Sequence, residues 1–516
     1  MDSILILDFG GQTTQLIGRR IRSFGVFSEI APGNGRLADI LHGDVKGIIL
    51  SGSPYSSLNE DAPVPDEAIL DCGLPILGIC YGFQQIALRS GGKVEAGTVR
   101  EYGRSRVSHD ASDTLLTGVP RNFLSWMSHG DGVSKAGEKF EVIARSKQGH
   151  VAAARHVAKS IWGVQFHPEA SHCEYGSQIL ENFAIEICRA KKEWTLERYL
   201  ETKIQDIRHS VGIRDVLLLI SGGVDSTVVA ALLLAALPRN RVHLMHIDTG
   251  LMRKDESSEV MESLKKLGAE HLHFVDAADR FLSALAGLED SEQKRKIIGD
   301  TFIRVQEEEI DRHLRGGFLL AQGTLYTDLI ESGHGVGQHA QMIKSHHNVG
   351  TPLVEAKRRA GELLEPLSQL YKDEVRQLGE LIGLPQDMVH RHPFPGPGLG
   401  IRIIRSITGE KIKMLQEADA IYIQELKARG LYDKIWQAFC VLLPVRSVGV
   451  IGDARDYAHV LALRAVVSHD GMTADVFQFP TDDLLEISAR ITNEVPGIGR
   501  VVYDVSSKPP ATIEWE

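Results

Sequence analysis

The sequence predicts an α/β protein with two doubly wound, mostly parallel-sheet domains, followed by a small α+β domain. A chain of 516 residues is too long for one hydrophobic core, and about three domains is the usual division. Short apolar runs alternate with helix-like stretches over the first two thirds, as in parallel sheets. Beyond a stretch rich in proline and glycine near residue 392, helix-like and strand-like stretches follow in an α+β order. We therefore expect domains at residues 1–191, 192–391 and 392–516.

Composition limits the classes of function. Hydrophobic residues make up 43% of the chain and charged residues 24%, as in soluble globular proteins. No apolar run reaches the roughly 18 residues of a membrane helix, and the start Met1-Asp2-Ser3 does not resemble a secretory signal. The net charge of −11 argues against general nucleic-acid binding. Five widely separated cysteines without a Cys-x-x-Cys pair indicate reduced thiols, so we expect a cytoplasmic protein without nucleic-acid or membrane partners.

In the first domain, a cysteine lies where a predicted strand meets a predicted helix. Residues 4–7, 47–50 and 75–79 are strand-like, and Cys80 directly follows the third of these runs. Reactive groups of parallel sheets gather at the carboxyl ends of strands, and a helix N-terminus favours a thiolate. We therefore expect an exposed, reactive thiol. The alternative is a packed structural cysteine, which is the usual fate of a free cysteine.

A base for this thiol follows a later strand. Residues 161–166 are strand-like, and His167-Pro168-Glu169 comes next, so that His167 could take the thiol proton while Glu169 orients the imidazole. Together with Gly78-Ile79-Cys80-Tyr81-Gly82, this pattern resembles the class I glutamine amidotransferases.

This resemblance implies glutamine hydrolysis. Cys80 would attack the side-chain amide, ammonia would leave, and water would clear the thioester. The backbone N–H groups of Gly52 and Tyr81 would hold the oxyanion. The resemblance assigns glutamine contacts to Gln84, Ser128 and His129. Family members usually have Ser-Gly-Gly-Pro at the first oxyanion donor, whereas this chain has serine at position 53, so we expect either backbone strain there or a displaced loop.

A charged, helix-like connector at residues 189–214 leads to the second domain, which opens with a phosphate-binding pattern. An apolar run at 216–220 precedes a glycine-rich turn, and a helix-like run at 227–237 follows it. Glycines allow close approach of the backbone, and the first N–H groups of the helix point at an anion. The proposed ATP-binding residues are Ser221, Gly222, Gly223, Val224, Asp225, Ser226 and Thr227. The alternative is a tight turn without a ligand.

The turn lacks the lysine of a Walker A loop and resembles the pyrophosphate loop of the ATP pyrophosphatase family. The resemblance implies cleavage of ATP between the α and β phosphates, leaving an adenylated substrate. We expect Mg²⁺ to accompany ATP, with Asp225 as a ligand. Asp248, which ends a strand at 241–247, could contact the ribose or adenine or could cap the next helix, and the sequence leaves both open. The basic residues 294–296 are either a solvated helix face or a phosphate contact, and residues 344–350 are typical of a lid.

The last third resembles the GMP synthetase family, both at residues 392–399 and at the C-terminus, where Pro-Pro and Trp515 favour a docked end. Residues 410–429 and 481–495 are helix-like, and residues 448–451, 460–467 and 501–505 are strand-like. The resemblance implies a homodimer formed through this domain. It also implies contacts with xanthosine monophosphate (XMP), from Arg253, Asp328, Gln437, Lys508 and Glu514.

These patterns together predict an enzyme that uses glutamine, ATP and XMP to make GMP, AMP and pyrophosphate. Asparagine synthetases also join the two activities, but their glutaminase needs a cysteine at the mature N-terminus, where this chain has Asp2 and Ser3. A tRNA-modifying adenylase would need a basic surface and a sulfur-carrying cysteine. A regulatory protein with an inactive glutaminase is the remaining alternative, and intact Cys80 and His167 argue against it. Residues 351–360 are longer and more basic than is usual in the family.

Overall fold

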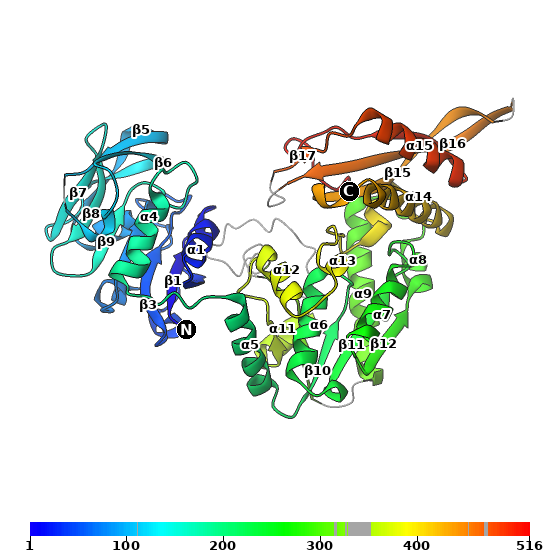
Figure 1. Cartoon of the computed structure of the whole chain (residues 1–516), viewed down its shortest axis with the longest axis horizontal. Coiled ribbons are helices and arrows are strands. Elements are labelled where there is room, and N and C mark those ends of the chain that lie inside the picture. The colour runs from blue at the N-terminus through cyan, green and yellow to red at the C-terminus, as the bar shows by residue number, and fades with distance from the viewer. Residues whose placement is uncertain (111, 314–316, 326–327, 329–351, 452–453, 469–472) are drawn as a thin grey trace. The chain divides into compact units, whose positions relative to one another are not determined.

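The computed structural model describes the chain except for residues 111, 314–316, 326–327, 329–351, 452–453 and 469–472. The described residues form two compact units (Figure 1). The first unit contains Met1–Tyr199, and the second contains the described parts of 200–326 and 346–516. The first unit extends to Tyr199, and the domain boundary expected at residue 191 stays a prediction.

The first unit is built on a nine-stranded sheet in the order β2-β1-β3-β4-β9-β8-β7-β5-β6. Its parallel part consists of β2 (Phe27–Pro32), β1 (Ser3–Asp8), β3 (Val45–Leu50), β4 (Ile76–Ile79) and β9 (Ile161–Val164). The strands expected at 4–7, 47–50, 75–79 and 161–166 are confirmed, and β1, β3 and β4 are almost entirely buried, which explains their apolar runs.

Four antiparallel strands extend this sheet, which the alternation pattern did not indicate. They are β8 (Val151–His156), β7 (Phe140–Ser146), β5 (Lys93–Ser108) and β6 (Asn122–Lys135). In β6 buried and more exposed residues alternate over the first half of the strand, as expected for a strand with one buried face. The helices of this unit are α1 (Thr14–Ser23), α2 (Leu37–Ile40), α3 (Tyr81–Arg89) and α4 (Gly176–Glu181), with short turns of helix η1 (Glu67–Asp71), η2 (Thr114–Leu116) and η3 (Asn182–Ile187).

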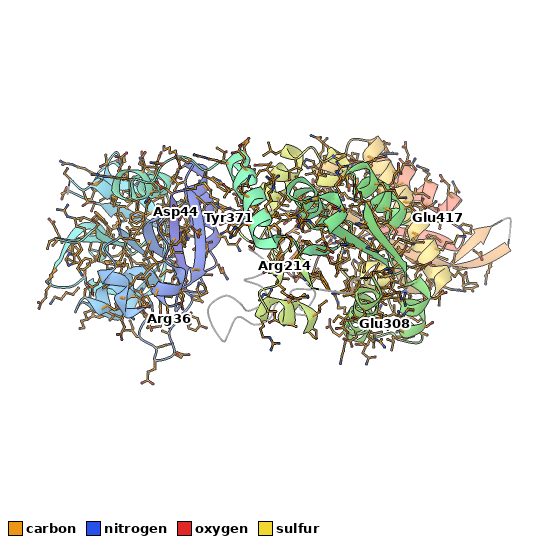
Figure 2. The ribbon with its side chains drawn as sticks, turned by 90° about the horizontal axis from the view of Figure 1, so that it is seen from below. Arg36, Asp44, Arg214, Glu308, Tyr371 and Glu417 are labelled. Carbon is orange, nitrogen blue, oxygen red and sulfur yellow. The ribbon has the colours of Figure 1, made fainter. Side chains whose placement is uncertain are left out.

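The second unit contains a five-stranded, wholly parallel sheet in the order β12-β11-β10-β13-β14. Its strands are β10 (Asp215–Leu219), β11 (Val242–Asp248), β12 (His271–Asp276), β13 (Phe318–Ala321) and β14 (Leu363–Leu364). Its helices are α6 (Val224–Ala236), α7 (Glu256–Lys266), α8 (Ala278–Leu285), α9 (Ser291–His313), α11 (Pro352–Arg359), α12 (Lys372–Leu381) and α13 (Gln386–Val389), with the turn η4 (Arg239–Arg241). Figure 2 labels Tyr371, which directly precedes α12, and Glu308 on α9, which pairs with Arg280 at 2.8 Å.

The chain from residue 392 forms a mixed sheet with two long helices. The long antiparallel pair β15 (Gln437–Ile451) and β16 (Ala454–Val467) is joined by β17 (Asp475–Val476) and by β18 (Ile498–Tyr503), which runs parallel to β16. Helices α14 (Gly409–Ala428) and α15 (Thr481–Glu494) pack beside these strands (Figure 1), and η7 (Gly398–Ile401) and η8 (Tyr432–Lys434) are short turns.

One hydrophobic cluster joins this sheet to the parallel sheet of the second unit. It includes Leu217 on β10, Leu320 on β13, Leu415 on α14 and Leu463 on β16. The expected boundary at residues 391 and 392 therefore lies inside one packed unit, and the division into a second and a third domain stays a prediction. No helix within the described ranges is long and apolar enough to cross a membrane. Helix α5 (Leu196–Val211) is the charged helix expected between the domains.

Candidate active sites

Cys80 lies at a sharp turn between β4 and α3. Its φ of 52° places the backbone in the left-handed region, which is costly for a residue with a side chain and is common where strain serves a site. The expectation of an exposed thiol is wrong, since Cys80 is only 4% exposed. The reason is that the backbone oxygen of Ser128 and the side-chain amide of Gln165 approach Sγ at 3.8 Å and 3.7 Å.

The residues predicted to serve as base and orienting acid adjoin the thiol. His167 lies close enough to Cys80 for the thiol to influence its pKa, and its Nδ1 lies 2.7 Å from Oε1 of Glu169, which is 1% exposed. Burial alone would lower the pKa of His167, but the negative charge of Glu169, the nearby Cys80 and the hydrogen bond to Glu169 raise it well above its usual value. The three side chains therefore form a connected cysteine–histidine–carboxylate chain.

The backbone of Gly52 lies against this chain. A Cβ added to Gly52 would lie 3.0 Å from Cε1 of His167 and 4.0 Å from Cβ of Cys80, so a side chain would crowd the histidine. Ser53 is not among the residues with positive φ, and its hydroxyl donates to the Phe9 carbonyl at 2.8 Å, so the backbone strain considered for serine at this position is absent. Tyr81 is the first residue of α3, and the first N–H groups of a helix have no partner inside the helix.

The β6 strand forms a wall beside the thiol. Gln84 donates from Nε2 to the Asp131 carbonyl at 2.8 Å, which ties α3 to this strand. Ser128 contributes the carbonyl near Cys80, and the next residue, His129, is buried. The structure thus gathers all the residues predicted for glutamine around Cys80, although their roles stay predictions.

In the second unit, the predicted phosphate loop joins β10 to α6. Gly222 has a φ of +81°, and a Cβ there would lie 2.6 Å from Cγ2 of Val260, so this position requires glycine for two reasons. The hydroxyls of Ser226 and Thr227 donate to the Gly223 carbonyl at 3.1 Å and 2.9 Å. The Gly223 carbonyl thus accepts from residues of α6, while the first N–H groups of α6 have no partner inside the helix and could bind an anion.

Two cations reach this loop from distant segments, and sequence reasoning missed both. Lys372, at the start of α12, contacts both carboxylate oxygens of Asp225 at 2.6 Å. Arg391 donates to the Gly222 carbonyl at 3.0 Å and lies 3.2 Å from Glu256. Neither residue belongs to a local motif, so no pattern in the sequence could have identified them.

The other predictions about ATP binding concern Asp248, a metal site and a lid. Asp248 ends β11 and accepts a hydrogen bond from the Gly250 N–H at 2.8 Å. The helix-cap alternative for Asp248 is wrong, because Asp255 occupies the N-cap of α7. No group of three or more metal-ligating side chains is arranged for a metal ion among the described residues. The predicted lid at 344–350 lies outside those residues.

A polar network in the second unit gathers several of the residues predicted for XMP. Gln437 donates to Glu514 at 2.9 Å and to the Pro393 carbonyl at 3.0 Å. Arg402, another residue missed from the sequence, is fully buried and donates to both carboxylate oxygens of Glu514 at 3.1 Å and 2.8 Å. Its Nη1 atom has no hydrogen-bond partner among the described residues, an unusual state for a buried guanidinium.

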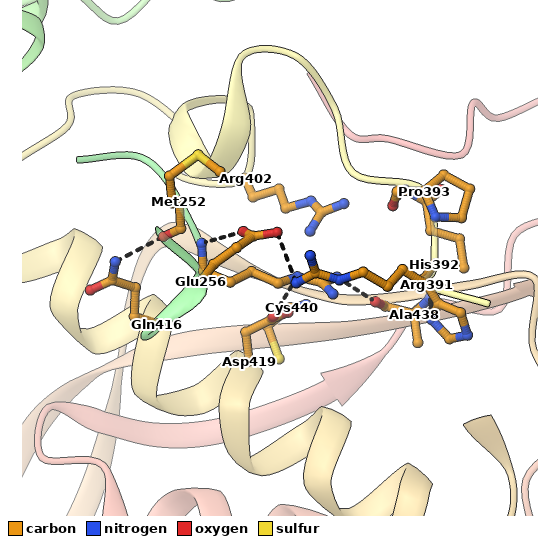
Figure 3. A network of polar contacts seen from close by, with 12 residues as sticks. Met252, Glu256, Arg391, His392, Pro393, Arg402, Gln416, Asp419, Ala438 and Cys440 are labelled. Carbon is orange, nitrogen blue, oxygen red and sulfur yellow. Dashed lines mark hydrogen bonds and ion pairs between the residues drawn. The ribbon is translucent and has the colours of Figure 1, made fainter. Parts of the chain in front are cut away.

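Arg253 belongs to the same network. Its Nε atom lies 3.2 Å from Asp419, and its guanidinium lies 5.2 Å from the centre of the Phe394 ring. Burial would lower the pKa of Arg253, but the carboxylates of Asp419 and Glu256 raise it. Figure 3 shows Glu256, Asp419 and the Ala438 carbonyl, which accepts from Arg253 at 3.3 Å.

The structure says less about Lys508 and Asp328, the two remaining residues predicted to contact XMP. Lys508 is half-buried, and its backbone N–H donates to the Ala474 carbonyl at 2.8 Å. Asp328 is half-buried between residues outside the described ranges, so its role stays a prediction.

The basic run at 294–296 corrects an expectation. Lys294 is fully buried rather than solvated, and its ammonium donates to the carbonyls of Gly400, Ile403 and Arg405 at 3.2, 2.9 and 3.2 Å. It also pairs with the Glu516 side chain, which fixes the end of the chain against α9.

The basic segment at 351–360 also has a structural role, in the part described. Lys357 on α11 donates to the Phe318 carbonyl and contacts Glu362, both at 2.9 Å, and Arg358 contacts Glu365 at 3.2 Å. Two of the basic side chains of this segment, Lys357 and Arg358, are thus paired with carboxylates within the second unit.

His392 directly follows Arg391, the residue that contacts the phosphate loop, and it bonds to the C-terminal sheet. Its ring stacks on Tyr432 with centroids 3.8 Å apart, and Nδ1 accepts from the Ala438 N–H at 3.2 Å. Nε2 then carries the proton donated to the Tyr432 carbonyl at 2.9 Å. Burial lowers the pKa of His392 to about 4, so the ring is neutral near neutral pH.

Comparison with known proteins agrees with both sites. Residues 5–187 match the family described as glutamine amidotransferase class-I, residues 207–290 match asparagine synthase, and residues 424–515 match the GMP synthase C terminal domain. Together, fold and sites define a glutamine amidotransferase joined to an ATP pyrophosphatase.

Full-length relatives narrow the class further. Glutamine-hydrolysing GMP synthases from Thermosipho africanus, Chlorobium luteolum and Aquifex aeolicus are 48%, 50% and 49% identical to this chain. The alignments cover 100%, 100% and 99% of this chain, and the same shares of the relatives. The chain belongs to the family of glutamine-hydrolysing GMP synthases, and glutamine-dependent, ATP-driven synthesis of GMP is its activity.

Proposed function

We propose that Cys80 is the nucleophile of glutamine hydrolysis and that the loop from Ser221 to Thr227 binds ATP for transfer of its AMP group to XMP. The observation that carries the first part is the Cys80–His167–Glu169 chain at a strained strand-to-helix turn. His167 takes the thiol proton as sulfur attacks the amide carbon, and then returns a proton to the departing ammonia. The N–H groups of Gly52 and Tyr81 stabilise the oxyanion.

The second part rests on the loop geometry and its remote cations. The N–H groups at the start of α6 bind the β and γ phosphates, and Lys372 supplies the positive charge that a Walker A lysine supplies elsewhere. The purine oxygen of XMP attacks the α phosphorus, pyrophosphate leaves, and ammonia then displaces AMP. Adenylation thus converts the purine oxygen, a poor leaving group, into part of AMP, a good leaving group, before ammonia attacks.

XMP is proposed to bind at the network of Arg402, Gln437 and Glu514. Nη1 of Arg402, which has no hydrogen-bond partner among the residues that the structure describes, would supply a donor for the phosphate or the ribose hydroxyls, as would the side chains of Arg253 and Lys508. Asp328 is kept as a further proposed contact.

We propose that Mg²⁺ enters with ATP beside the same loop, where it would replace the Lys372 ammonium that contacts both carboxylate oxygens of Asp225 at 2.6 Å. Magnesium prefers substrate phosphates, water and one or two carboxylates over a site made only of protein ligands. Asp225 is the carboxylate of the loop and lies at the start of α6, where bound phosphates are expected. We propose Asp225 as the protein ligand, with Asp248 for the ribose or the adenine. The ion would offset the negative charge of the leaving pyrophosphate.

Homodimer formation through the C-terminal sheet is also proposed. Val448 and Tyr457 are paired across β15 and β16, and Val450 follows on the same face of β15. These three side chains are 51%, 60% and 76% exposed, an apolar strip that a second copy would cover. We also propose a cytoplasmic location, because all five cysteines are unpaired thiols. Sedimentation velocity of the wild type and of Val450→Lys tests the dimer, which the variant should weaken.

The test of the division of labour is Cys80→Ala. The variant should lose GMP formation with glutamine and keep it with ammonium salts, because the thiol serves only ammonia release. Loss of both reactions, or retention of both, would overturn the assignment of Cys80. Product analysis with XMP should find AMP and pyrophosphate, and ADP with phosphate would exclude the adenylate route.

A further inference from the structure

A buried acid–histidine pair lies behind the glutamine site. Glu101 on β5 and His129 on β6 are directly opposite each other in the antiparallel ladder, so their side chains share a face of the sheet. They are 5% and 9% exposed, and Nε2 of His129 lies 3.4 Å from Oε2 of Glu101. No motif in the sequence singled out Glu101.

Few other polar groups contact the facing atoms of Glu101 and His129. The Ser146 hydroxyl donates to Oε1 of Glu101 at 2.9 Å. Neither Oε2 of Glu101 nor Nε2 of His129 has a hydrogen-bond partner among the described residues, so their contact at 3.4 Å is an electrostatic one without the alignment of a hydrogen bond. Burial of a carboxylate is costly, and a buried ion pair adds little to stability compared with apolar side chains of the same size. A contribution to the stability of the fold therefore does not explain why this buried pair is present.

The pair is connected to the thiol through its own strand. Ser128, next to His129, places its carbonyl 3.8 Å from Sγ of Cys80, and Asp131 accepts from Gln84 at 2.8 Å. Burial lowers the pKa of His129, the charge of Glu101 and the Asp131 backbone oppose this, and the nearby His167 lowers it further. The charge of the proposed base His167 therefore influences the pKa of His129.

We propose that Glu101 is a positioning residue for glutamine hydrolysis. Its carboxylate attracts Nε2 of His129 across 3.4 Å and fixes that ring, and the fixed ring holds the strand from Ser128 to Asp131 beside Cys80 as one wall of the glutamine pocket. The inference rests on the proposed role of Cys80. Without the carboxylate, the ring of His129 loses this charged contact at Nε2, and the wall loosens.

The first test is Glu101→Gln, assayed with glutamine and separately with ammonium. Removing the charge of one partner of a buried pair weakens what the pair holds in place, so the KM for glutamine should rise about tenfold, which corresponds to about 1.4 kcal/mol, while kcat changes less than about threefold. A purely structural role would instead reduce the active fraction, which lowers kcat and leaves KM unchanged. Turnover with ammonium should stay within about twofold of the wild type.

Two further variants make the test specific. Glu95→Gln removes an exposed carboxylate from the same strand and should leave both assays unchanged. Glu101→Asp keeps the charge and should recover part of the glutamine affinity.

A double-mutant cycle provides the decisive comparison. If Glu101 acts through His129, adding Glu101→Gln to His129→Asn should change the KM for glutamine by less than about twofold. Multiplicative effects, an unchanged KM in Glu101→Gln, or an equal loss with ammonium would each overturn the inference. Cys80→Ala, measured in parallel, separates this failure from failure of the proposed nucleophile, since only the latter leaves that variant active with glutamine.

Discussion

Replacement of Glu169 by glutamine tests how the protein activates its thiol. The change keeps the size of the side chain and removes one charge, 2.7 Å from Nδ1 of His167, at a position 1% exposed. The charge of Glu169 is a main cause that holds the pKa of His167 above its usual value. Without this charge, burial becomes dominant and lowers the pKa of His167, so the imidazolium that forms during thiol attack is less stable.

The size of the effect follows from the contact that is lost. A buried, charge-assisted hydrogen bond contributes about 1.5–3 kcal/mol, which corresponds to a loss of about 10- to 100-fold in kcat with glutamine. Rates of AMP formation with glutamine and with ammonium, at the same ATP and XMP concentrations, measure it. The ammonium rate should not change, because it bypasses the thiol.

A control and a contrary result sharpen this prediction. Glu174→Gln changes a carboxylate five residues further along, exposed and bonded to the Leu124 N–H, and should have little effect on either rate. A glutamine rate of Glu169→Gln within about twofold of the wild type would refute the reasoning, as would an equal loss with ammonium.

Three further predictions concern the second unit. Lys372→Met should raise the KM for ATP about tenfold or more, because the loop loses one of its two cations. Lys266→Met on the exposed face of α7 should not raise it, and ammonium-dependent kinetics measure both. The pKa of His392 is about 4 when folded, so between about pH 6.5 and pH 4 the unfolded chain binds more protons and stability falls as the pH falls. His392→Asn should remove up to about 3 kcal/mol of this pH dependence in urea unfolding, and His150→Asn, at an exposed position, should keep it. Lys294→Met should lower the melting temperature measured by calorimetry, because three carbonyls lose their donor.

Local chemistry explains which parts of the structure the sequence predicts. The glycines before α6 and the cysteine after β4 are recognisable because strand, turn and helix are contiguous in the chain. The buried parallel strands are equally visible as apolar runs. The strand β6 was missed because its polar residues, such as Ser128 and His129, interrupt the apolar pattern where the strand lines the site.

Tertiary contacts explain the rest. Lys372 reaches Asp225 across 147 positions of the chain, and Arg402 reaches Glu514 across 112. Glu101 pairs with His129 only because β5 and β6 are in register. Lys294 resembles a solvated lysine in a charged helix, and only the fold shows that three carbonyls surround its ammonium. Such residues become visible when distant segments meet.

Oxygen-18 at the purine carbonyl of XMP that is replaced by nitrogen gives the most direct test of adenylation. If the loop after β10 holds pyrophosphate while the α phosphorus passes to that oxygen, mass spectrometry should find one oxygen-18 in each AMP released. Label in pyrophosphate, phosphate or water, with unlabelled AMP, would contradict the account.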